Sequence, residues 1–414
     1  MNALAPLHHA PFRFLLAGRT VNALGNSFAP IALAFAVLDL TGSATDLGFV
    51  VGARTVVNVI FLLFGGVLAD RLPKNLLLVG SSALAALTQG AVAVLVLTGT
   101  ATIPLLIGLS ALNGMVAALA LPASSSMLPL TVPADIRQQA NAISRVALNS
   151  AAILGAPIAG IVVAAIGPGW GIVIDATTFV LAGLCFLVLK LPAVPQPAER
   201  PHLIADLRTG WSEFRSRTWL WVVVAGFAVF NAAWGGGLFI LGPLVADDTF
   251  GRRAWGFLLA AQTGGMIVGA LIAMRLRLRR MLYLGVACCI PLAGPVFLLG
   301  IYPRVWLLLP VAFVGGLALE QFGVAWETSM QEHVPADKLA RVYSYDMVGS
   351  FVAMPVGEMT IGPIAGAAGL EPTLIGAGLL MTLAVLAMLS SRDVRELRHK
   401  LPEPEIPTVK ESVA

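Results

Sequence analysis

The sequence predicts an all-α membrane protein in which twelve transmembrane helices form two six-helix bundles. Its composition, its long uncharged runs and an internal repeat lead to this prediction. Hydrophobic residues make up 58% of the 414 residues and charged residues only 12%, whereas a soluble domain carries roughly 25% charged residues. The stretch 75–134 has no charged side chain and is long enough for two spans of about 20 residues.

The apolar runs are predicted to be helices rather than barrel strands. Within a bilayer, backbone polar groups are satisfied only in helices or in closed barrels. Barrel strands alternate apolar and polar residues over about 10 positions, but these runs are continuously apolar and rich in Ala, Leu, Gly and Val. The predicted spans are 12–38, 46–69, 75–98, 103–128, 139–166, 170–190, 219–245, 254–274, 281–301, 305–330, 342–367 and 372–391.

A repeated pattern divides the chain into two halves. Residues 132–135 and 334–337 both read Val-Pro-Ala-Asp, and Pro-Ile-Ala-Gly follows each copy, at 157–160 and 363–366. Such repeats are typical of transporters whose two bundles rock about a central site. We therefore expect a six-helix bundle over 1–191, a cytoplasmic linker with an amphipathic helix over 192–217, a second bundle over 218–391 and a disordered tail over 392–414.

The distribution of basic residues predicts the orientation of the bundles. Most of the 26 Lys and Arg residues fall in the loops and tails on one side, and the opposite loops hold only Arg252, Arg253 and Arg304. The positive-inside rule then places both termini in the cytoplasm, as in a multi-pass protein of the inner (plasma) membrane. No basic patch is interleaved with exposed aromatic residues, so the lipid bilayer is an expected partner and nucleic acid is not.

A glycine-rich, charged turn joins the second and third predicted spans. Residues 65–74 begin with a glycine pair that includes Gly66, which would let neighbouring helices approach closely. They continue with Asp70, Arg71 and Lys74, one acid and two bases at the predicted cytoplasmic rim. With this motif and with all twelve spans, the sequence resembles the major facilitator superfamily. The resemblance implies that Asp70 engages the cytoplasmic start of span eleven, where Asp346 offers the two bases a partner.

Two proline motifs narrow the resemblance. Pro157 and Pro363 lie among small residues in spans five and eleven, where a proline removes one helix hydrogen bond and permits bending. These motifs resemble the kink of exporters within the superfamily, although Ala156 stands where a second glycine is usual. The sequence is most similar to the twelve-span bacterial branch of macrolide efflux and enterobactin-type exporters. The residues behind this similarity are Ala53, Arg54, Asn58, Gly169, Trp170, Asp175, Trp326, Glu327, Ser344, Tyr345 and Asp346.

Polar residues inside the spans are the candidate substrate contacts. An ionisable residue at mid-bilayer costs roughly 2.5–3.5 kcal/mol, so it normally faces a cavity or a partner. Arg19, Asn22 and Asn26 fall on one helical face, and the resemblance implies that spans one, four, seven and ten line a central cavity. The candidates are Arg19, Asn22, Asn26, Asn113, Asn231, Trp234, Glu320, Gln321 and Trp326. The alternative for each Asn or Trp is a helix-to-helix hydrogen bond or an interfacial anchor.

A pair of charges is predicted to close the outer side. At 1.5 Å per residue, Arg54 in span two and Glu358 in span eleven both lie roughly 12–14 Å below the outer surface, and the resemblance places these spans side by side. We predict that the two residues pair there, the alternative being that each pairs within its own half. Asp70 and Arg71 with the start of span eleven would form the cytoplasmic counterpart, and exchanging the two contacts would supply alternating access.

Protonation of a carboxylate is the predicted trigger, because a carboxylate in a dry site resists ionisation. Glu320 is the first candidate, since it lies deep in a span that the resemblance places at the cavity. Glu358, Asp175 and Asp39 are the others.

Three functions remain open. The chain has no phosphate-binding loop and no hydrolase motif, so we expect neither ATP drive, enzymatic activity, a cofactor nor a metal. The favoured function is a monomeric, proton-coupled exporter of amphipathic small molecules, drugs or natural products, working by alternating access. The alternatives are an importer or symporter on the same fold and a membrane-embedded enzyme or non-transporting receptor.

Overall fold

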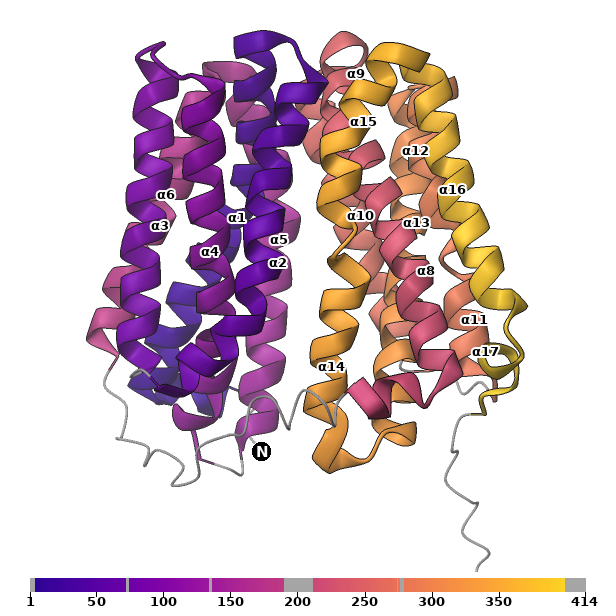
Figure 1. Ribbon diagram of the computed structural model, residues 1–414. Helices are drawn as coiled ribbons and strands as arrows, with labels where there is room; N and C mark the ends of the chain where they lie inside the picture. The colour runs from indigo at the N-terminus through magenta and orange to yellow at the C-terminus, as the bar shows by residue number, and fades with distance from the viewer. Residues whose placement is uncertain are drawn as a thin grey trace, which may run out of the picture.

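The computed structural model describes residues 4–71, 74–133, 136–189, 211–273, 275 and 279–398, and within these ranges every regular element is a helix. Twelve helical segments are long and apolar enough to cross a membrane, which confirms the predicted all-α fold and its twelve spans. Figure 1 shows them as two groups side by side, one formed by the N-terminal half and one by the C-terminal half. The side chains of residues 62–75 lie outside the described part, so nothing follows for Gly66, Asp70, Arg71 or Lys74.

The observed helices begin and end within a few residues of the predicted spans. The N-terminal half contains η1 (Ala5–His8), α1 (Ala10–Thr41), α2 (Ala44–Arg71), α3 (Lys74–Leu97), α4 (Ile103–Met127), η2 (Leu128–Leu130), α5 (Arg137–Ile166) and α6 (Pro168–Val188). The C-terminal half contains α8 (Thr218–Trp234), η4 (Gly235–Leu241), α9 (Gly242–Asp248), α10 (Arg252–Ala273), α11 (Met281–Ala287), η5 (Ile290–Ala293), α12 (Gly294–Ile301), α13 (Val305–His333), α14 (Ala336–Phe351), α15 (Met354–Ala368), α16 (Leu370–Ser390) and α17 (Arg392–Glu396).

Two ends of the bundle are distinguished by the chain termini. The terminal end is the one where α1 begins and α17 lies, at the bottom of Figure 1, and the far end is the opposite one. The expectation of a disordered tail from Arg392 onward is wrong for its first residues, because α17 is helical and buries Val394. Of the expected amphipathic linker helix, residues 203–210 lie outside the described part and the helix is seen from Trp211.

The described end of the linker is attached to the start of α14. The Lys338 ammonium lies 2.8 Å from one oxygen of Glu213, and the Arg217 guanidinium lies 2.5 Å from the other. Hydrogen bonds from Lys338 and Arg217 lower the pKa of the Glu213 carboxyl. The rings of Trp211 and Phe214 both contact Tyr345 of α14. The linker therefore contacts the terminal half of span eleven.

Three spans of the C-terminal half are interrupted, whereas each N-terminal span is one described helix. Span seven contains a π-helical turn (η4) that begins with three glycines. Span nine divides into α11, η5 and α12, and span eleven divides into α14 and α15 just before Pro355. A proline has no backbone N–H to continue the helix, and the Asn231 amide donates a 2.9 Å hydrogen bond to the Ser350 carbonyl beside that break.

The two halves contact each other at small residues. Helix α2 packs on α15, and α5 packs on α10. Gly48 lies directly against the Glu358 carbonyl, and Gly160 and Gly256 face each other so closely that a methyl group on Gly160 would lie 3.1 Å from the Gly256 Cα. These positions are all in the far-end parts of their helices, and α2 contacts α15 more extensively than it contacts α14. Close backbone contact of this kind requires small residues.

Replacing Gly48 with alanine should destabilise the protein, because the added methyl group would meet the Glu358 backbone carbonyl. Overpacking of this kind costs typically about 1–3 kcal/mol. Gly80→Ala is the matched control, since nothing lies within 4 Å of its added carbon. The melting temperature of the purified protein is expected to fall for Gly48→Ala and to stay level or rise for Gly80→Ala. Equal melting temperatures for the two variants would contradict the close contact.

Candidate functional site

Close packing of α1 against α6 sets the direction of the polar side chains in span one. A methyl group added to Gly18 would lie 2.6 Å from the Phe186 ring, and Gly25 lies directly against Thr178 and Asp175 of α6. These glycines are two turns apart, so they mark one face of α1. Arg19, Asn22 and Asn26 occupy a neighbouring face, and all three line a cavity.

Two adjacent cavities share the side chains of Arg54 and Asn113. The first measures about 210 Å³, lies between the halves, and is lined by both halves, with Glu358 and Gln89 among apolar residues that include Trp255. The second measures about 310 Å³ and lies within the N-terminal half, between α1, α2, α3, α4 and α6. Ligand pockets typically measure roughly 300–1,000 Å³, so the second cavity alone reaches the size of a small-molecule site.

A buried polar cluster links these cavities, and we define it as Arg54, Gln89, Asn113, Asp175 and Glu358. The Arg54 Nε donates a 3.1 Å hydrogen bond to the Asn113 Oδ1, and the Gln89 Nε2 donates a 2.7 Å bond to the Asp175 Oδ2. Asp175 and Glu358 are 0% and 1% exposed, and the charge of each acts on Arg54. The cluster thus holds two carboxyl groups away from water, near one partly exposed cation.

Each carboxyl group of the cluster could accept a further hydrogen bond. One oxygen of Asp175 and one of Glu358 are buried without a hydrogen-bond partner in the described part of the chain. Buried polar atoms are normally paired, and an ionised carboxylate is costly to leave without partners. A protonated carboxyl group or a bound water would remove part of that cost.

The predicted direct pair of Arg54 with Glu358 is not formed in this structure. The two residues line the same cavity from α2 and α15, but the ion pairs found within 4.0 Å among the described residues do not include them. Asn113 holds the guanidinium of Arg54, and Glu358 lies on the Gly48 side of span two near Thr55. The interaction between them is a longer-range electrostatic one.

The C-terminal candidates are mostly engaged inside their own half. Trp326 donates from its ring nitrogen to the Asp346 carboxyl over 3.0 Å, and the Ser350 hydroxyl donates to the other oxygen over 3.2 Å. The Asn231 amide is used at the helix break. Asp346, expected to receive Arg71 or Lys74, is thus already bonded within the C-terminal half.

The remaining C-terminal candidates also lie outside the lining of the two cavities. Gln321 donates to the Gly269 carbonyl over 2.6 Å, and Trp234 packs edge-on against Phe239. Glu320 is half-buried beside α10 and within electrostatic reach of Arg145 on α5. Glu320 therefore faces a cation of the other half rather than the polar cluster.

Asp39 lies on the exposed far rim rather than in a dry site, and it takes part in a bridge between the halves. Both of its carboxylate oxygens accept hydrogen bonds from Arg252 at the start of α10. The same guanidinium donates to both oxygens of Asp247 over 2.7 and 2.9 Å and lies 4.7 Å above the Phe35 ring. Paired fork-like bonds of this kind are the strongest form of salt bridge.

Two proline motifs lie at the contacts between the halves. Pro157 falls inside α5, where the neighbouring Ala156 carbonyl lies 2.5 Å from the position of a methyl group on Gly256. Pro363 falls inside α15, next to Gly362. A methyl group on Gly362 would lie 2.6 Å from the backbone of Thr45. Neither proline interrupts its helix.

Comparison with known proteins identifies the family. The profile of the Major Facilitator Superfamily matches residues 15–358. The chain belongs to the major facilitator superfamily. It is therefore a multi-pass membrane transporter and not an enzyme.

Relatives of this superfamily member include an efflux pump. The chain is 26% identical to the multidrug efflux pump Tap of Mycolicibacterium fortuitum, over 94% of this chain and 97% of that protein. It is 24% identical to the MFS-type transporter YvqJ of Bacillus subtilis (strain 168), over 65% of each chain.

Solved transporters share the fold. One is a bacterial homolog of the human lysosomal transporter Spinster in an inward-facing, unoccupied conformation, with a TM-score of 0.73, 14% identity and coverage of 93% of this chain and 96% of that chain. Another is the nucleoside transporter NupG, with a TM-score of 0.71, 14% identity and coverage of 95% and 100%.

Sequence reasoning missed Gln89 and Arg252. Gln89 is a polar residue deep in a span that carries no charged side chain, and its position there was a usable signal. Arg252 lies in a predicted outer loop. Its two acidic partners, Asp39 and Asp247, lie at the ends of two different spans. Only the folded structure brings these three residues together.

Removing the Asp39 charge should loosen the far end, because it breaks the bridge to Arg252. Exposed ion pairs are worth roughly 0.2–1 kcal/mol, so the population of far-end-open molecules should rise by up to about fivefold. The reporter is a cysteine at Leu259, which lines the cavity between the halves, in a protein whose three native cysteines are replaced. The measured quantity is the rate at which a maleimide labels this cysteine. Asp248→Asn is the control, because Asp248 is exposed and forms no ion pair with the described residues. Equal labelling rates in Asp39→Asn and Asp248→Asn would rule out the bridge as a lock.

Proposed function

We propose that this superfamily member is a monomeric, proton-coupled exporter of amphipathic small molecules, drugs or natural products, in the plasma membrane with both termini in the cytoplasm. The observation that carries the proposal is the buried polar cluster, in which the charges of two carboxyl groups act on one cation and in which Arg54 and Glu358 line a cavity shared by both halves. The similarity to a multidrug efflux pump over nearly the whole chain supports export. The basic loops and tails support the orientation.

The charges of the cluster suggest how a proton drives the cycle. With both carboxylates ionised, Arg54 faces two negative charges, and uptake of one proton makes the cluster neutral. A neutral cluster costs less to remove from water than a charged one. The protonated cluster therefore favours the closed far end, and loss of the proton to the cytoplasm favours return to the outward-open state with substrate bound.

The position of Glu358 connects this chemistry to movement. Glu358 lies on α15, four residues beyond the start of that helix at Met354, and α15 packs on α2 of the other half. When the halves rock, the separation between Glu358 and Arg54 must change. Asp175 stays in the same half as Arg54 and remains a fixed partner.

The direction of transport is tested in a pump-deficient host. Cells that express the protein should accumulate less fusidate, novobiocin or tetracycline than cells that do not, and a protonophore should remove the difference. Raised accumulation of any of these compounds would indicate an importer or symporter instead. No difference for all three, together with failure to move them in proteoliposomes under a pH gradient, would overturn multidrug export.

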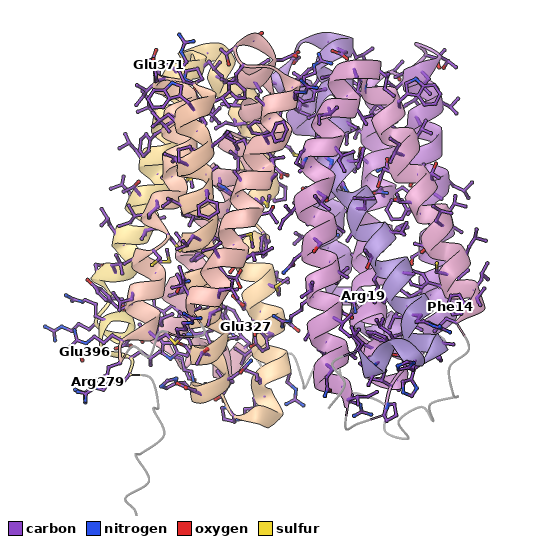
Figure 2. The ribbon with its side chains drawn as sticks, turned by 180° about the vertical axis from the view of Figure 1, so that it is seen from behind. Phe14, Arg19, Arg279, Glu327, Glu371 and Glu396 are labelled. Carbon is purple, nitrogen blue, oxygen red and sulfur yellow. The ribbon has the colours of Figure 1, made fainter. Side chains whose placement is uncertain are left out.

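Neutralising either carboxyl group of the cluster should uncouple transport from the pH gradient. In proteoliposomes, Glu358→Gln and Asp175→Asn are expected to lower gradient-driven transport roughly tenfold or more, the effect of about 1.4 kcal/mol on a rate, while substrate exchange without a gradient continues. Glu371→Gln is the control, since Glu371 is exposed at the far end (Figure 2). Glu320→Gln separates the candidates, because full loss in that variant with normal Glu358→Gln and Asp175→Asn would move the coupling site to Glu320.

A further inference from the structure

The cavity inside the N-terminal half is positively charged. Among the described residues, its lining includes the guanidinium groups of Arg19 and Arg54 and no carboxylate. The other polar side chains of the lining are neutral: Asn22, Asn26, Ser81, Ser82 and Asn113. Figure 2 shows Arg19 within the N-terminal half, nearer the terminal end than the far end.

The two arginines of this cavity differ in their partners. Arg54 is bonded to Asn113 and lies within the field of Asp175 and Glu358. Arg19 has no carboxylate within 4.0 Å among the described residues, and no hydrogen bond from its guanidinium is found there either. A guanidinium in a membrane span normally pairs with an anion, so Arg19 is a cation whose partner is not part of the described protein.

A second, independent feature lies one turn further along α1. The side-chain oxygen of Asn22 is buried and has no hydrogen-bond partner in the described structure. Buried amide oxygens are almost always bonded. Arg19 and Asn22 both line this cavity, so the residue with the unused acceptor lies at the same space as the unpaired cation.

We propose that this cavity binds the anionic group, a carboxylate or a phosphate, of the transported molecule. Arg19 holds the anion through its two-pronged guanidinium, and Asn22 accepts a hydrogen bond from a neighbouring hydroxyl or N–H group of the same molecule. The apolar part of the lining, which includes Val116, Phe179 and Phe186, contacts the hydrocarbon part. The transported compounds are then amphipathic organic acids, an inference that rests on the proposed transport function.

The test compares matched probes on the purified protein. 1-Naphthylacetate, 1-naphthyl phosphate and the neutral 1-naphthylacetamide share one ring system, and their binding is measured at equilibrium by the shift in melting temperature. The acid or the phosphate should stabilise the wild-type protein at concentrations at least about tenfold lower than the amide, as expected for a hydrogen-bonded charge. Whichever of the two binds better tells a carboxylate site from a phosphate site.

Variants then assign the effect to Arg19. Arg19→Gln should abolish the preference for the charged probes, and Arg19→Lys should keep part of it, because lysine retains the charge without the planar fork. Arg13→Gln is the matched control, since Arg13 is an exposed arginine of the same helix. Equal binding of acid and amide by the wild type, no binding of either anion, or an unchanged preference in Arg19→Gln would overturn the proposal.

The wild-type comparison needs no variant, so a misfolded Arg19→Gln protein would leave the test intact. Binding at equilibrium is also independent of the direction of transport. An importer could still prefer the acids, and an exporter could still bind acid and amide alike, so the two proposals fail separately.

Discussion

Backbone contact between the halves at the far end is the constraint on which the other features depend. Gly48, Gly160 and Gly256 stand where one helix backbone meets another, and in a membrane such contact, rather than burial of apolar surface, brings helices together. The contact lies beside the cavity that Arg54 and Glu358 line. Both carboxyl groups of the polar cluster are buried, and burial raises the cost of the ionised form of a carboxyl group.

The two halves contribute different properties. The N-terminal half has unbroken helices and holds most of the polar cluster, with Arg54, Gln89, Asn113 and Asp175 on four different spans. The C-terminal half has the interrupted spans seven, nine and eleven, and interruptions of this kind are where helices bend. Glu358 lies just beyond one interruption, so the carboxyl group of an interrupted span lies near a cation on an uninterrupted one.

The sequence predicted the parts of this arrangement that arise within one helix. Apolar runs predicted twelve spans, and the spacing of Arg19, Asn22 and Asn26 predicted one polar face, which does line a cavity. Contacts between helices were harder to predict. Arg54 bonds Asn113 instead of pairing with Glu358, because the nearer partner depends on side-chain directions, which the spacing of residues along the chain does not reveal. The breaks in spans seven, nine and eleven were also missed. Pro355 looks no different in sequence from Pro157, which α5 accommodates without a break, and the glycines of η4 do not by themselves indicate a π-helical turn.

Two polar contacts at different depths must respond together when the far end opens. The rim bridge joins Asp39 of α1 to Arg252 of α10, and the deeper interaction is the longer-range electrostatic one between Glu358 of α15 and Arg54 of α2. Each joins one half to the other, so a rigid rotation of the halves that breaks the rim bridge also admits water to the cluster. Because water lowers the cost of an ionised carboxylate, the same movement that releases the rim changes which protonation state of the cluster is stable. In the proposed proton-coupled cycle, the cluster beneath the rim bridge is what makes this movement sensitive to pH.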